Sequence, residues 1–350
     1  MNAVATRAPQ GLTSLTAEDV ASVPQEVVSR IRAAHTVLTV CHENPEADAL
    51  GSALALALAV EQLGGRATPV CADAAPQMYD FMPRIERFRQ DPDPSLDYDL
   101  IVVGDCGDLA RIGPVLNRNA ELFGRVPIVN IDHHVSNVGF GAVDWIDATA
   151  AATCEMDTLL MPALGVPLTA ADGAIAAALI AGVVIDTANF QHPNVTPRTL
   201  RVAAELVGVG APLAETARLL YRTKPNRQLQ LFGRVLGRLQ TDLDGRLVWS
   251  SLDDDDFAAT KTTAEDAEGL SDLLSQSAEA ALVILFRQNG DRTKISVRTR
   301  AGGPDATVLT GTFGGGGHAR AAGATIALSV KEAERAVLAE ARQLLREDGD

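Results

Sequence analysis

Four short apolar runs, each followed at once by acidic or histidine side chains, constrain the fold of this chain more than any other feature. The runs cover residues 36–41, 100–103, 126–131 and 182–185. Helix-like sequence lies between them, and the approach to the fourth run also has a helical pattern. Continuous apolar runs separated by helices are typical of a parallel sheet covered on both faces. We therefore expect an α/β fold for the first two-thirds of the chain.

The last third of the chain has a different pattern. Strand-like segments lie at residues 246–252, 281–287 and 294–300, and helices are expected at 264–276 and 330–345. The turn Asn289-Gly290-Asp291 separates two of the strands, as in a hairpin. We expect two lobes, an N-terminal parallel-sheet domain and a smaller C-terminal α/β domain, joined by a helical linker. The expected boundaries are 1–205 for the first domain, 206–238 for the linker and 239–350 for the second domain.

Composition excludes some classes of function. Lys and Arg number 30 against 45 Asp and Glu, which gives a net charge of −15. Such a surface repels long nucleic acids, whose affinity comes mainly from neutralised phosphates, but it is compatible with a short nucleotide held by metal ions. The four cysteines form no CxxC pair and are expected to be buried thiols. The N-terminus has no signal-peptide pattern, and the most apolar helix is too short to span a bilayer, so a cytoplasmic protein is expected.

Potential metal ligands follow every apolar run. His42 and Asp48 follow the first run, Asp105 follows the second, Asp132, His133 and His134 follow the third, and Asp186 follows the fourth. In an open parallel sheet, ligands bind beyond the carboxyl ends of the strands, so these side chains can meet in one crevice. Carboxylate and imidazole ligands suit ions such as Mn²⁺ or Mg²⁺. Two such ions about 3.5–4 Å apart could share a carboxylate and activate a bridging hydroxide for in-line attack at phosphorus.

Five motifs resemble the DHH phosphoesterase superfamily and occur along the chain in the order that the family has. They are Asp132-His133-His134; His42-x-Asn44-Pro45-x-x-Asp48-x-x-Gly51-Ser52; Gly104-Asp105 with Arg111; Asp186-Thr187-x-x-Phe190; and Gly314-Gly315-Gly316-Gly317-His318 followed by Ala321-Ala322-Gly323. The last motif is similar to that of the DHH-associated C-terminal domain. The resemblance covers roughly residues 30–330. Within the superfamily, the chain is most similar to the NrnA-type branch. It implies a manganese-dependent enzyme that degrades very short oligoribonucleotides and dephosphorylates 3′-phosphoadenosine 5′-phosphate, while some relatives hydrolyse cyclic di-AMP or its linear product.

The resemblance also implies residue roles. Two Mn²⁺ ions, with Mg²⁺ as an alternative, would be held by His42, Glu46, Asp48, Asp105, His133 and Asp186, with Asp105 bridging them. His134 would lie near the scissile phosphate, Asp132 would orient the histidines, and Arg111 would assist at the phosphate. Position 46 departs from the family pattern, because Asp is usual and this chain has Glu46. The longer side chain could displace, weaken or exchange the first ion.

A second group of residues is expected to bind the substrate. Glycines allow dihedrals and close approaches that side chains block, and successive N–H groups in such a loop can form an anion nest. The predicted substrate-binding residues are Asn137, Arg298, Gly314, Gly315, Gly316, Gly317 and His318. With one lobe cutting and the other binding the far end of the substrate, the enzyme would select short substrates without reading bases. The expected partners are short single-stranded RNA or DNA and small nucleotides, with no membrane, and a homodimer is compatible with the sequence.

Three other functions share parts of this pattern. A family II inorganic pyrophosphatase or an exopolyphosphatase would use the same metal motifs, although the glycine-rich loop argues against the pyrophosphatase. A RecJ-like nuclease for long strands would be expected to carry a further nucleic-acid-binding domain and a less acidic surface. A non-catalytic nucleotide sensor is favoured only by Glu46. Comparing pyrophosphate with a dinucleotide as substrate would distinguish the pyrophosphatase from an NrnA-type enzyme. Metal-dependent turnover would exclude the sensor.

Overall fold

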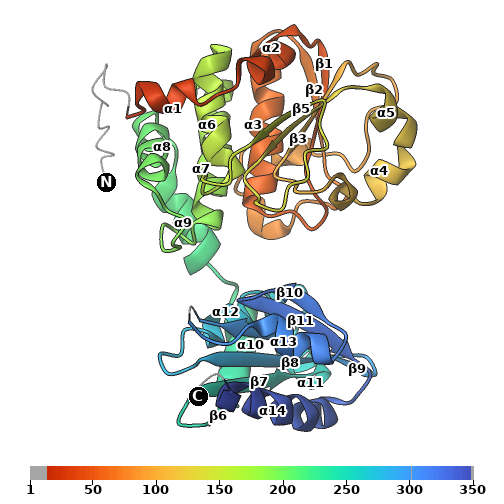
Figure 1. Cartoon of the computed structure of the whole chain (residues 1–350), viewed down its shortest axis with the longest axis vertical. Helices are drawn as coiled ribbons and strands as arrows, with labels where there is room; N and C mark the ends of the chain where they lie inside the picture. Colours follow the sequence, from red (N-terminus) through yellow and green to blue (C-terminus); the bar gives the residue numbers. More distant parts are fainter. Residues whose placement is uncertain (1–13, 301, 348–350) are drawn as a thin grey trace. The chain divides into compact units, whose positions relative to one another are not determined.

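The protein forms two compact units, residues 1–223 and 224–350, in a computed structural model that describes residues 14–300 and 302–347. Figure 1 shows a sheet with helices in each unit. The α/β fold class expected from the sequence is confirmed: the first unit has a parallel sheet, and the second unit has a separate mixed sheet. None of the described helices is long and apolar enough to cross a membrane.

The first unit is built on a five-stranded sheet in which every neighbouring pair is parallel. The strands are β1 Thr36–Val40, β2 Arg66–Val70, β3 Leu100–Gly104, β4 Ile128–Asp132 and β5 Val143–Ile146. Their order is β2-β1-β3-β4-β5, so the chain changes direction across the sheet between β1 and β3. The expected strands at 36–41, 100–103 and 126–131 are therefore present. The switch point places the ends of β1 and β3 beside each other, where such sheets bind ligands.

Helices cover both faces of this sheet, as the continuous apolar strands require. One core packs α3 (Ala47–Gln62) with α6 (Thr153–Leu164) and α7 (Ala174–Asp186), and a separate core on the other face joins the strands to α4 (Pro114–Arg118) and α5 (Ala120–Arg125) (Figure 1). The α-helices are α1 Ala17–Ala21, α2 Gln25–Ala33, α3 Ala47–Gln62, α4 Pro114–Arg118, α5 Ala120–Arg125, α6 Thr153–Leu164, α7 Ala174–Asp186, α8 Pro197–Gly208 and α9 Leu213–Arg222. Short 3₁₀ helices are η1 Gln77–Tyr79, η2 Ile85–Arg87, η3 Leu109–Ile112 and η4 Ala171–Gly173.

The fourth expected strand is wrong, because residues 182–185 belong to helix α7. This helix is almost entirely buried, so it has no polar face that would reveal its period. A short apolar run in a buried helix cannot be distinguished from a buried strand by periodicity. Gly182 explains why the helix passes so close to the polar residues: a Cβ there would lie 2.4 Å from both Asp48 Oδ1 and Cys154 Sγ. Asp186 thus ends a helix rather than a strand.

The second unit is built on a six-stranded mixed sheet ordered β10-β11-β9-β8-β7-β6. Its strands are β6 Gln240–Asp242, β7 Leu247–Leu252, β8 Leu282–Asn289, β9 Arg292–Thr299, β10 Gly316–His318 and β11 Ala321–Ile326. Only β7 and β8 pair in parallel among these strands. The expected hairpin is confirmed, since Asn289 pairs with Arg292 across the turn.

Helices pack on both faces of the second sheet in two separate cores. They are α10 Asn226–Leu236, α11 Asp254–Thr260, η5 Glu265–Ala267, α12 Leu270–Leu274, α13 Ala306–Thr312 and α14 Val330–Glu347. The single helix expected at 264–276 is wrong. Gly269 adopts φ +81°, a left-handed conformation that interrupts the helix. It therefore separates η5 from α12.

The cysteines and the tryptophans are placed as follows in the two units. Cys41, Cys71, Cys106 and Cys154 are free and buried, as expected from the sequence. Each unit contains one tryptophan, Trp145 in β5 and Trp249 in β7.

Candidate metal centre

The ends of three neighbouring strands position three of the six predicted ligands, His42, Asp105 and His133. Strand β1 leads through Cys41 into His42, which is 3% exposed, and strand β3 leads directly into Asp105, which is 1% exposed. Asp105 adopts φ +56°, a conformation that non-glycine residues seldom take and that often marks functional sites. Asp132 is the last residue of β4, with His133 and His134 immediately after it. The sheet topology therefore gathers these side chains at one edge.

The six predicted ligands and His134 form overlapping groups of metal-binding atoms. His42, Glu46 and Asp105 form one group, and Asp48, His133 and Asp186 form another, with the ligand atoms of each group all within 4.8 Å of one another. A third group is Asp105, His133 and His134. Asp105 thus belongs to two groups and His133 to two. The arrangement offers two adjacent positions for cations, with Asp105 beside both.

The distances within these groups are short. His42 Nε2 lies 3.2 Å from Glu46 Oε1 and 3.6 Å from Asp105 Oδ2. His133 Nε2 lies 3.5 Å from Asp105 Oδ1 and 3.2 Å from Asp186 Oδ2. Glu46 reaches the group despite its extra methylene because it precedes α3 as the N-cap residue, with its side chain 40% exposed.

The pKa values indicate a site with excess negative charge. Burial opposes a charge on His42 and His133, but hydrogen bonds to carboxylates outweigh it and raise their pKa to about 10 and about 12. Burial favours neutral Asp105, yet His133 and His42 hold its pKa well below the usual range. Burial, followed by the charges of Asp186 and Asp105, raises the pKa of Asp48 well above its usual value. Several carboxylates therefore compete for few positive groups, which favours cation binding.

One buried atom tests directly whether a metal ion suits this site. Asp105 Oδ2 is buried and has no hydrogen-bond partner within the described residues, since His42 Nε2 lies 3.6 Å away, beyond hydrogen-bond distance. A buried carboxylate oxygen without a partner is costly unless another group, such as a cation, completes its surroundings. The donor set of carboxylates and imidazoles, with no thiolate in any group, matches Mn²⁺ or Mg²⁺. The residues present therefore fit divalent ions.

Asp132 orients the histidine pair rather than joining the ligand groups. It is fully buried, and its Oδ1 accepts hydrogen bonds from His134 Nδ1 at 2.7 Å and from the His133 amide at 2.9 Å. Its Oδ2 accepts a bond from Asn137 Nδ2 at 2.6 Å. Asn137, predicted to contact substrate, thus has its amide nitrogen engaged with Asp132. The hydrogen bond that His134 donates to Asp132 is the main cause that raises the pKa of His134.

The start of helix α6 is a part of the site that sequence reasoning missed. The amides of Thr153 and Cys154 donate to the two oxygens of Asp48 at 2.7 and 2.9 Å, and the Thr153 hydroxyl donates to Asp105 Oδ1 at 3.2 Å. A helix N-terminus favours negative charge, so this contact stabilises the Asp48 carboxylate inside the core. No sequence signal marks Thr153, because its role depends on two backbone amides and one hydroxyl.

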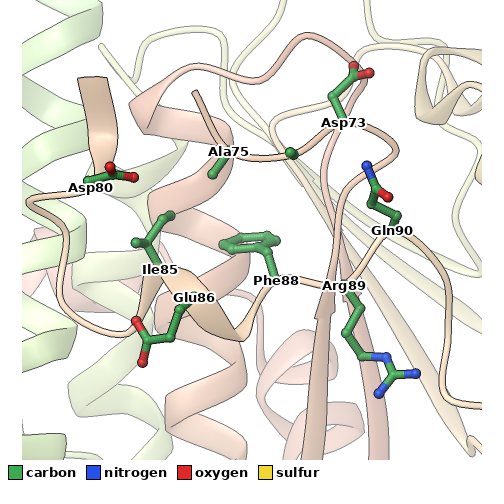
Figure 2. A pocket seen from close by; sticks show the side chains of 9 residues that line it. Asp73, Ala75, Asp80, Ile85, Glu86, Phe88, Arg89 and Gln90 are labelled. Atoms are coloured by element: carbon green, nitrogen blue, oxygen red, sulfur yellow. The ribbon is translucent and has the colours of Figure 1, made fainter. Parts of the chain in front are cut away.

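Two other features lie beside this centre. Arg111 is in η3 with an exposed side chain, and its carbonyl accepts a hydrogen bond from the Glu43 amide at 2.8 Å. A hollow of about 460 Å³ is lined by residues 73–75, 80, 85–86 and 88–90. In Figure 2, the Phe88 ring lies beside Ile85 and Ala75. Asp73 at its edge accepts a hydrogen bond from the Asn44 amide at 2.7 Å, so the hollow borders the loop that carries His42. None of the predicted site residues lines it.

Two of the predicted substrate-binding residues of the second unit, His318 and Arg298, share one sheet face. His318 pairs with Ala321, which in turn pairs with Arg298, so the three positions lie side by side across β10, β11 and β9. His318 is exposed, and Arg298 Nε donates to Asp272 Oδ1 at 2.8 Å. The glycine run is not all loop, because Gly316 and Gly317 pair with β11. Gly315 fits tightly, as a Cβ there would lie 2.2 Å from the Gly323 carbonyl oxygen.

Comparison with known proteins identifies the class. A model described as the DHH family, N-terminal domain, matches residues 36–194, and the DHHA1 domain model matches residues 250–347. The chain belongs to the DHH family and is a hydrolase of phosphoester bonds. It is 36% identical over 310 residues to the bifunctional oligoribonuclease and PAP phosphatase NrnA of Thermus thermophilus, covering 88% of this chain and 90% of the relative. The NrnA of Bacillus subtilis is 26% identical, covering 92% and 98%.

Solved structures agree on the fold. An exopolyphosphatase-related protein from Bacteroides fragilis has a TM-score of 0.81 at 20% identity, covering 95% of this chain and 100% of the other. The exonuclease RecJ, solved with manganese bound, has a TM-score of 0.50 at 15% identity, covering 97% and 96%. Both are distant in sequence and show the fold alone.

Proposed function

We propose that this protein is a metal-dependent phosphoesterase that degrades short oligoribonucleotides and removes phosphate from 3′-phosphoadenosine 5′-phosphate. The observation that carries the proposal is the sharing of Asp105 and His133 between ligand groups that meet in one buried site. Support also comes from the NrnA relatives, whose names state these two activities. The cytoplasmic location and the homodimer stay predictions.

Residues of the first unit would have two roles, binding the metal ions and contacting the scissile phosphate. His42, Glu46 and Asp105 would hold one Mn²⁺, and Asp48, Asp105, His133 and Asp186 the other. Bound there, the two ions would supply Lewis acidity at the phosphoryl oxygens and lower the pKa of a nearby water. Asp132 accepts a hydrogen bond from His134 Nδ1 and favours the protonated ring, whose Nε2–H would donate to the scissile phosphate. Arg111, with its exposed guanidinium, would provide a further phosphate contact.

We assign the exposed sheet face of the second unit to the part of the substrate remote from the scissile phosphate. Gly314, Gly315, Gly316 and Gly317 would approach the substrate backbone closely, and His318 would donate to a terminal phosphate or stack on a base. Arg298, which lies on the same face and is paired with Asp272, would contact the same part of the substrate. A preference for very short substrates would follow if both contacts must be made at once.

A panel of substrates tests this proposal. Dinucleotides, 3′-phosphoadenosine 5′-phosphate, cyclic di-AMP and pyrophosphate would each be incubated with the protein and either Mn²⁺ or Mg²⁺. We expect the first two to be hydrolysed fastest, with Mn²⁺ preferred. Fastest turnover of pyrophosphate would favour the pyrophosphatase alternative instead. Nucleotide binding without metal-dependent turnover would favour the sensor.

A further inference from the structure

Residues 147–155, which we call the support segment, contact the proposed ligands from several directions. The Ala150 carbonyl lies 3.3 Å from His133 Nδ1, within hydrogen-bond reach. The amides of Thr153 and Cys154 bind Asp48, as described above. His133, which follows a strand, and Asp48, which lies in a helix, therefore both contact the backbone of this one segment. Movement of this segment would disturb the ligand groups together.

A buried ion pair holds the two ends of the support segment. Glu155 is completely buried, and its Oε2 accepts a hydrogen bond from the Ala151 amide at 3.2 Å. Its Oε1 accepts a bond from Arg198 Nε at 2.6 Å, and Arg198 Nη1 lies 2.8 Å from Asp147 Oδ2. One guanidinium from α8 thus joins the first and last residues of the segment. The forked geometry of arginine is required for two partners in different directions.

Asn194 connects the support segment to the proposed ligand Asp186. Asn194 Nδ2 donates to the Ala151 carbonyl at 3.1 Å and to the Asp186 carbonyl at 3.2 Å. The Asp147 amide donates to the Asp132 carbonyl at 3.0 Å. The segment therefore connects the backbone of the histidine motif with that of Asp186. The proposed activity has no chemical role for Arg198, Glu155 or Asn194, yet all three converge here.

We propose that Arg198 is a positioning residue: through Glu155 and Asp147 it holds the support segment and so sets the affinity of the Asp48–His133–Asp186 group for a divalent cation. This inference rests on the proposed function, since it assumes that the group binds such an ion. Outer groups that orient metal ligands typically change metal affinity by about 10- to 100-fold when they are lost. Arg198 lies one shell further out, so its effect is expected near the lower value.

The test is calorimetric titration of Mn²⁺ into Arg198→Met, with Arg201→Met as the matched control. Arg201 lies on the same helix and binds the buried Asp19 through two hydrogen bonds of 2.8 and 2.7 Å, so its loss should damage stability in a similar way. Neither Arg201 nor Asp19 belongs to a ligand group. We expect Arg198→Met to weaken the affinity for at least one ion about tenfold, and Arg201→Met to leave it within about twofold.

Two further variants separate positioning from loss of folded protein. Arg198→Lys can reach only one of its two acceptors and should fall between the wild type and Arg198→Met. Arg198→Met with Glu155→Gln removes the unpaired buried charge, so its melting temperature should recover while its Mn²⁺ affinity stays weak. In activity assays, Arg198→Met should require more Mn²⁺ for half-maximal rate, with kcat largely restored at saturating Mn²⁺.

The outcomes distinguish this inference from the proposed function. Equal Mn²⁺ affinities for Arg198→Met and the wild type, or equal losses in both arginine variants, would overturn the role of Arg198. No Mn²⁺ or Mg²⁺ binding by the wild type would instead refute the metal assignment. In that event, NMR of the metal-free protein still decides whether Arg198 positions the site: the His133 ring signals should shift in Arg198→Met and not in Arg201→Met, and unchanged signals would overturn it.

Discussion

The proposed site residues of the two units differ in how far they are buried. In the first unit, the central side chains Asp105 and Asp132 are buried and each is contacted by several partners. In the second unit, His318 is exposed on a short strand, and Arg298 has Asp272 as its charged partner. A buried, densely connected site fixes geometry, whereas an exposed face can accept substrates that differ in base. Under the proposed function, the first unit would determine the chemistry and the second would determine recognition.

The largest effect should come from the residue shared by two ligand groups. Asp105→Ala should lose both ions and abolish turnover while the protein stays folded, because the partnerless buried oxygen and its charge are removed. Elemental analysis and circular dichroism of the purified variant are the measurements. Asp108→Ala is the control, since Asp108 only caps η3 through the Ala110 amide and should keep its metal. Two ions and normal activity in Asp105→Ala would show that the ligand assignment is wrong.

The unusual Glu46 offers the next largest effect. Its Oε1 lies 3.2 Å from His42 Nε2, so Glu46→Ala should raise the Mn²⁺ concentration for half-maximal activity by at least the roughly tenfold that an outer-shell partner is worth. Glu46→Asp should preserve or raise activity. Glu43→Ala serves as the control because Glu43 belongs to none of the ligand groups. An unchanged Mn²⁺ titration for Glu46→Ala would mean that the site works without this side chain.

Recognition by the second unit should be separable from cutting. His318→Ala should lower kcat/KM for a dinucleotide about ten- to a hundredfold, the loss of one charge-assisted hydrogen bond of about 1.5–3 kcal/mol. Metal content should not change. Hydrolysis of bis-p-nitrophenyl phosphate, which is too small to need the second unit, should change little. Arg335→Ala on α14 is a surface control. Equal losses on both substrates would place His318 in the chemistry or the fold and remove the contrast between units.

The smallest effect concerns stability, and it contrasts two buried aspartates. Burial raises the pKa of Asp157 on α6 to about 8, and neither of its carboxylate oxygens has a hydrogen-bond partner within the described residues. The folded state therefore holds a proton that the unfolded state releases near pH 4, so the free energy of unfolding falls as the pH rises from about 4 to 8. Asp157→Asn should flatten this slope and be more stable than the wild type at pH 8. Urea denaturation at pH 5 and pH 8 measures both.

Asp256 in the second unit should behave in the opposite way. Burial would raise its pKa, but hydrogen bonds from Arg238 and Arg234 lower it below the usual value. Its contribution to stability is present above the unfolded pKa and is lost as the pH falls further. Asp256→Asn should therefore destabilise the protein at neutral pH. The same sign of change in Asp157→Asn and Asp256→Asn would contradict the difference between the units.

The sequence predicted the strands and ligands that follow simple local rules. His42, Asp105 and the Asp132-His133-His134 run stand directly after apolar strands, so their convergence follows from parallel topology. Helix α7 was mistaken in part for a strand because a helix buried all round has no polar face. Thr153 and Arg198 could not be found, because they act through backbone amides and partners at least 43 residues away. Such contacts leave no spacing pattern in a single sequence.

The placement of the two tryptophans has a spectroscopic consequence. Trp145 reports on the parallel sheet and Trp249 on the mixed sheet, and these are the chain's only indoles. Replacing one by phenylalanine would leave intrinsic fluorescence with a single origin. Unfolding of each sheet could then be followed in the full-length chain without an attached dye. Emission from Trp145, which is 6% exposed and lies on the strand beside β4, would also be a natural signal for quenching by paramagnetic Mn²⁺.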